Sequence, residues 1–184
     1  MGRTGGTVDQ RDARAGGEIA RIVFAVLLLL FALAQGPVVQ ALFPLDVTPN
    51  VVLVLVVLWA GYHGMRAGIA WAFFAGVFLD LLLFDPLGSH ALAMMAVVVA
   101  IEPVRHLAFG ENHAWALVAV FVAALLSDVV FLVVSNMAGH PMHLDTLWHF
   151  SIARALTDVL AAVVCMPLVL WLRRWGIHGD FATR

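Results

Sequence analysis

The chain has 184 residues, of which 63% are hydrophobic and only 12% are charged, and its mean hydropathy is +0.99. A soluble domain is about half apolar and about a quarter charged, so this composition excludes an ordinary water-soluble domain and indicates a membrane protein. The formal net charge of -2, with no lysine, excludes a nucleic-acid-binding surface, and the single cysteine excludes an internal disulfide.

Hydropathy along the chain predicts six membrane spans, each near the roughly 20 apolar residues that a bilayer-crossing helix needs. In chain order they are Ile22–Phe43, Val47–Tyr62, Ala67–Phe84, Leu87–Ile101, Ala114–Asn136 and Phe150–Leu172. Thr48 is expected to cap the second span, with Pro49 at its first helical position. The second and fourth spans are short, so they are expected either to tilt little or to be shielded by neighbouring helices. The sequence therefore predicts an all-α integral membrane protein with six transmembrane helices.

The tails and the connections between spans predict the orientation of the chain. Residues 1–18 are rich in Gly and Arg and predict a disordered tail, residues 19–175 form the six-span membrane domain, and residues 176–184 form a second tail. One set of connections and tails contains Arg3, Arg11, Arg14, Arg21, Arg66, Arg105, Arg173, Arg174 and Arg184. The opposite connections contain Asp46, Asp85 and Asp145 and no arginine. Because arginine-rich connections face the cytoplasm, both termini are predicted there.

Four charged residues lie within the predicted spans and form an expected intramembrane polar cluster: Asp80, Asp128, Arg154 and Asp158. A charge at membrane depth is retained where it faces protein or a water-filled cavity. Their positions within the spans place all four in the outer half of the membrane, where Arg154 is expected to serve one or two of the carboxylates. Three interpretations remain open, namely a structural polar knot, a docking site for another membrane protein, and a proton or ion pathway.

Small residues on the third span predict close helix packing. Gly68, Ala72 and Gly76 recur at intervals of four and share one helix face with Asp80. This packing stripe is expected to make contacts inside the chain, because Asp80 on the same face needs partners from the fifth or sixth span.

No sequence motif in the chain indicates catalysis. The sequence has no Gly-rich phosphate loop, no G-x-S-x-G motif and no Cys–His pair. Three histidines, His140, His143 and His149, lie near the last outer connection, but their spacing favours solvated loop residues over a metal site. The sequence therefore predicts neither an enzyme nor a bound cofactor or metal.

Several short motifs resemble the MreD family of bacterial rod-shape-determining membrane proteins. In that family a P-[DN] pair opens the second span, a G-x-x-x-D segment closes the third, and an L-G turn opens the fourth. The matching residues here are Pro49, Asn50, Gly76, Asp80, Pro86, Leu87 and Gly88. The segment Leu126–Val130 resembles the acidic fifth span of the family more loosely, and Arg154 and Asp158 match no family position.

The resemblance implies a non-enzymatic membrane scaffold of the machinery that elongates the lateral cell wall. Such proteins are expected to lie in the bacterial cell membrane and to bind MreC, a single-span protein with an extracytoplasmic domain. Through MreC they connect MreB filaments to a RodA-type glycosyltransferase and its class B transpeptidase. The family is similar in fold to the six-helix substrate-binding components of vitamin transporters.

Two other functions remain as alternatives at this point. The chain could be a small-molecule-binding subunit of a vitamin transporter, which would need a ligand pocket open to the outside. It could also conduct protons or ions through its intramembrane carboxylates.

Overall fold

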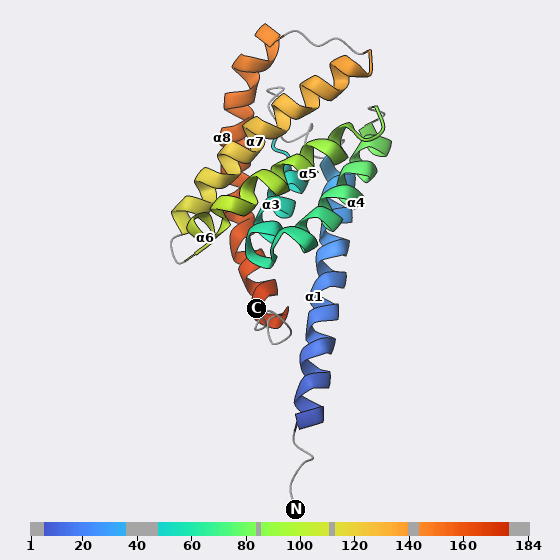
Figure 1. Ribbon diagram of the computed structural model, residues 1–184, viewed down its shortest axis with the longest axis vertical. Helices are drawn as coiled ribbons and strands as arrows, with labels where there is room; N and C mark the ends of the chain where they lie inside the picture. Colours follow the sequence, from blue (N-terminus) through green and yellow to red (C-terminus); the bar gives the residue numbers. More distant parts are fainter. Residues whose placement is uncertain (1–5, 36–47, 84–85, 111–112, 140–143, 177–184) are drawn as a thin grey trace, which may run out of the picture.

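The computed structural model describes residues 6–35, 48–83, 86–110, 113–139 and 144–176, and these residues form a bundle of helices without strands (Figure 1). The helices are α1 Gly6–Gln35, α3 Val51–His63, α4 Met65–Leu83, α5 Ser89–Ile101, the 3-10 helix η1 Glu102–Val104, α6 Arg105–Ala108, α7 His113–Met137 and α8 Leu144–Gly176. The predicted fold class, an all-α integral membrane protein, is confirmed.

Four helical segments within the described part of the chain are long and apolar enough to cross a membrane. They are Met65–Leu83, Ser89–Ala108, His113–Met137 and Phe150–Leu172. Helix α3 is equally apolar but shorter. The first predicted span coincides with the second half of α1 as far as Gln35, and its remaining residues, 36–43, lie outside the described residues.

Two predicted boundaries differ from the observed ones. Helix α1 begins at Gly6, so it includes residues 6–18 that the sequence assigned to a disordered tail. A helix is costly to nucleate but cheap to extend, so an apolar helix can continue into a polar segment. The N-cap of α3 is Asn50, not Thr48, and Pro49 precedes the helix. The division of the chain into two tails and a membrane domain stays a prediction.

Helix α3 lies at the centre of the bundle. Every residue from Val52 to Gly61 is buried, and α3 packs against α1, α4, α5, α7 and α8. A helix that is apolar on all faces is stable only when it is enclosed. With 13 residues it is about 20 Å long at 1.5 Å per residue, so the longer helices around it shield its ends, as its length predicted.

The helices α4 and α5 form a tightly packed hairpin, and the packing stripe of small residues on α4 contacts both α5 and α3. A Cβ atom at Gly76 would overlap the backbone of Ala91 at the start of α5, and one at Gly68 would overlap Ala60 of α3. Ala72 is fully buried. Close backbone approach of this kind is how membrane helices gain packing energy, so the described contacts of the stripe are made inside the chain.

The two ends of the bundle differ. Figure 1 shows the start of α1 and the end of α8 at one end, while α4 and α7 finish and α5 and α8 begin at the other. Asp80 lies in the last turn of α4 and therefore at this second end. Large apolar side chains cover the outside of the bundle, including Phe73, Phe74 and Leu160, as expected for surfaces that face lipid.

Candidate functional site

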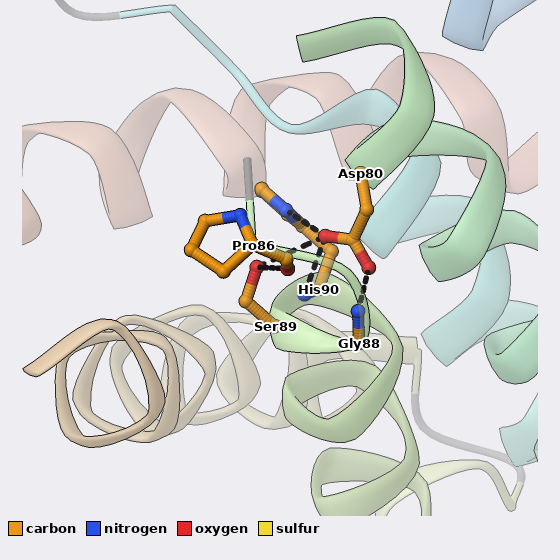
Figure 2. A network of polar contacts seen from close by, with 5 residues as sticks. All are labelled: Asp80, Pro86, Gly88, Ser89 and His90. Carbon is orange, nitrogen blue, oxygen red and sulfur yellow. Dashed lines mark hydrogen bonds and ion pairs between the residues drawn. The ribbon is translucent and has the colours of Figure 1, made fainter. Parts of the chain in front are cut away.

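The buried carboxylate of Asp80 holds the turn between α4 and α5 (Figure 2). Asp80 is 1% exposed. One carboxylate oxygen accepts a hydrogen bond from the Gly88 backbone N–H at 2.7 Å. The other accepts bonds from the Ser89 hydroxyl at 3.0 Å, and from the His90 backbone N–H and ring Nδ1 at 2.9 Å each. A single side chain of α4 therefore gathers four donors from the first residues of α5.

The start of α5 explains why a carboxylate is needed there. The N-cap of α5 is Gly88, which adopts a left-handed φ of 95° and offers no side chain to cap the helix. The first N–H groups of any helix lack partners within the helix, and leaving them buried and unpaired is costly. Asp80 accepts from the backbone at this terminus, and its position beside the positive end of the helix dipole is favourable. The α4–α5 hairpin is thus closed by an acceptor from α4.

The start of α3 is satisfied in the same way by a different helix. The Asn50 side chain accepts the N–H of Leu53 at 3.0 Å, while the backbone N–H of Asn50 donates to Asp158 Oδ1 of α8 at 2.5 Å. Asp158 is fully buried. Non-helical backbone at membrane depth is tolerated where protein satisfies it, and Asp158 supplies that partner for the residues before α3.

The third carboxylate pairs with the arginine of the predicted cluster. Asp128 Oδ1 of α7 and Arg154 Nη2 of α8 are 2.9 Å apart. The Ser151 hydroxyl of α8 also bonds to Asp128. The Asp128 side chain is 9% exposed and that of Arg154 is 36% exposed, so the pair sits at the edge of the buried region. This ion pair ties α7 to α8.

His90 connects the hairpin to the ion pair. Its Nδ1 bonds to Asp80, its ring lies against Phe131 of α7 with centroids 4.7 Å apart, and it is close enough to Asp128 for an electrostatic interaction. Arg154 in turn interacts electrostatically with Asp158. The polar groups therefore follow one another across the bundle in the order Asp80, His90, Asp128, Arg154 and Asp158. We call these five residues, with Asn50, the polar layer.

The structure changes the predicted pairing within the cluster. Asp80 was expected to find its partners on the fifth or sixth span. Its hydrogen-bond partners instead come from the α4–α5 turn, and Arg154 pairs with Asp128. The error arose because charge complementarity was considered and the unpaired N–H groups of a helix terminus were not.

Three polar residues of this region were not predicted from the sequence: Ser89, His90 and Ser151. Ser89 and His90 directly follow the Leu-Gly turn, where the first turn of a helix needs acceptors, so two polar residues at the edge of an apolar run were the available signal. Ser151 lies three residues before Arg154, on the same face of α8, and this spacing was the signal for it.

The residues of the family motif lie at two helix joints. Pro49 and Asn50 lead into α3, and Pro86, Leu87 and Gly88 form the turn before α5. Gly76 packs on α5 and Asp80 caps it. Within the part of the chain that the structure describes, no group of three or more His, Cys, Asp or Glu residues is arranged to hold a metal ion.

Comparison with known proteins identifies the family. The family model described as rod shape-determining protein MreD matches residues 17–175, which is most of the chain. No curated protein and no solved structure matches the chain. A match of this extent covers every helix that contributes to the polar layer, and the chain therefore belongs to the MreD family of rod shape-determining membrane proteins.

Proposed function

We propose that this protein is a non-enzymatic scaffold of lateral cell-wall elongation that binds MreC in the bacterial cell membrane, with both termini in the cytoplasm. Through MreC it connects MreB filaments to a RodA-type glycosyltransferase and its class B transpeptidase. The family match over residues 17–175 is the observation that carries this proposal.

The contacts of the polar layer support a scaffolding role. Asp80 and Asp158 accept hydrogen bonds from helix starts, and Asp128 pairs with Arg154 between two helices. These side chains connect α3, α4, α5, α7 and α8 to one another. A scaffold needs its helices held together in this way, because a partner helix in lipid gains little from the hydrophobic effect and depends on close packing against them.

Co-purification with MreC tests the proposal. The affinity-tagged chain is co-expressed with MreC, extracted in mild detergent and purified on the tag, and MreC is expected in the eluate. An unrelated single-span membrane protein expressed at the same level serves as the control and is expected to be absent. A second readout is cell shape, since depletion of the chain is expected to turn rods into spheres. Failure to recover MreC, together with rods that persist after depletion, would reject the proposal.

A further inference from the structure

Arg154 has a second potential partner that its ion pair with Asp128 leaves unused. Its Nε atom is buried and has no hydrogen-bond partner, and the same holds for Oδ2 of Asp158. The two residues lie four apart on α8, where side chains on successive turns are neighbours. Arg154 already interacts electrostatically with Asp158. A buried N–H donor and a buried carboxylate oxygen, both unsatisfied, therefore lie on the same face of one helix.

We propose that Arg154 is a two-position switch that pairs with Asp128 on α7 or with Asp158 on α8. The guanidinium offers five N–H donors in a planar fork, so it can rotate from one carboxylate to the other without losing its charge-assisted bonds. In the described conformation Arg154 forms an ion pair with Asp128 through Nη2. In the second conformation Nε–H donates to Oδ2 of Asp158.

The two positions have different consequences for the bundle. Asp158 uses Oδ1 for the Asn50 backbone, so it can accept Arg154 at Oδ2 without releasing α3. Besides Arg154, the described interactions of Asp128 are with the Ser151 hydroxyl of α8 and with His90 of α5. Arg154 is therefore the arginine that ties Asp128 and α7 to α8. Loss of the Asp128 charge therefore frees α7 from the arginine of α8, while α8 stays bound to the start of α3. The charge on Asp128 controls how firmly α7 and α8 are joined at this end.

The side-chain Nε–H signal of Arg154 in ¹⁵N NMR of the detergent-solubilised protein reports the position directly. It is assigned by its loss in Arg154→Lys. In Asp128→Asn, transfer to Asp158 is expected to shift this signal and to slow its hydrogen exchange about tenfold or more, as a charge-assisted bond requires. Arg105, paired with Glu102 in a different part of the bundle, is the control and is expected to remain unchanged. Loss of the Asp128 charge shifts the Arg154 signal in any case, so protection from exchange is the deciding readout, and an Arg154 signal that gains no protection in Asp128→Asn would overturn the proposal.

A second variant keeps the test valid if Asp128→Asn does not fold. In the wild-type protein, exchange between two pairings broadens the Arg154 Nε–H signal, and Asp158→Asn removes the negative charge that attracts Arg154 to the second position while it keeps an acceptor oxygen. The signal is then expected to sharpen at the position of the Asp128 pair. If Asp158→Asn leaves the width and position of the signal as they are in the wild type, Arg154 has a single partner and the switch does not exist.

Discussion

Removal of the Asp80 carboxylate is expected to be among the most damaging single changes to this bundle. Asp80→Ala deletes the acceptor for the backbone N–H groups of Gly88 and His90 and for the His90 ring. The Ser89 hydroxyl keeps its other bond, to the carbonyl of Pro86 at 2.8 Å. The two backbone N–H groups and the His90 ring therefore each lose a hydrogen bond to a buried carboxylate.

The size of the effect follows from the number of bonds lost. Polar contacts between membrane helices contribute about 0.6 kcal/mol on average and up to about 1.7 kcal/mol, so three of them amount to roughly 2–5 kcal/mol. For a chain of this length, 1 kcal/mol corresponds to about 2–4 °C in the unfolding temperature. Asp80→Ala is thus expected to lower the unfolding temperature by at least about 4 °C. Asp80→Asn keeps an acceptor oxygen and is expected to lose less.

Thermal unfolding in mild detergent, followed by near-UV circular dichroism, measures this difference. The neighbouring Leu81→Ala is the matched control, because Leu81 is 58% exposed on the outside of α4. An Asp80→Ala protein whose unfolding temperature lies within about 1 °C of that of Leu81→Ala would refute the capping role.

Three further predictions concern packing, the start of α3 and topology. Gly76→Leu is expected to lower the yield of folded protein in gel filtration, because a side chain there overlaps the backbone of Ala91, whereas Leu at the exposed position Ala70 is expected to leave the yield unchanged. A well-folded Gly76→Leu protein that had lost only MreC binding would show that the packing stripe is a docking surface. Asp158→Ala, which removes the acceptor of the Asn50 N–H, is expected to lower the unfolding temperature by more than Asp158→Asn, and equal melting of both variants and the wild type would contradict this. In a Cys165→Ala background, single cysteines are expected to react with an impermeant thiol reagent in intact cells where they replace Asp46, Asp85 and Asp145. Those that replace Arg66 and Arg105 are expected to react only after permeabilisation, and their labelling in intact cells would reverse the topology.

Apolar run length predicted most of the helices, and its limits appear at the helix ends. The third span was expected at Ala67–Phe84 and is observed at Met65–Leu83. At the start of α3, Thr48 was expected as the cap, with Pro49 at the first helical position. Asn50 caps the helix instead, and its backbone N–H donates to Asp158, which lies more than a hundred residues away. That tertiary contact could not be predicted from the local sequence.

For the candidate site, the sequence predicted which charged residues are buried but not which partners they have. The pattern placed Asp80, Asp128, Arg154 and Asp158 at membrane depth on protein-facing sides of their helices. It did not indicate which helices are adjacent, so the partner of each carboxylate was open. Two of the three carboxylates accept from backbone N–H groups, which every residue except proline carries, and for this reason charge pairing alone misassigned Asp80.

Two carboxylates of the polar layer accept backbone N–H groups at the starts of the short helices α3 and α5. Each helix has 13 residues, and at the start of each a backbone N–H donates to a carboxylate from another helix. Longer helices provide the missing acceptors, Asp158 from α8 and Asp80 from α4, so the short helices are fixed by side chains that cannot be replaced by lipid. Substitutions in the polar layer are consequently expected to reduce folding and partner binding together. The surface that contacts MreC must therefore be sought by changing exposed apolar residues such as Phe74 and Leu160, whose loss leaves these joints intact.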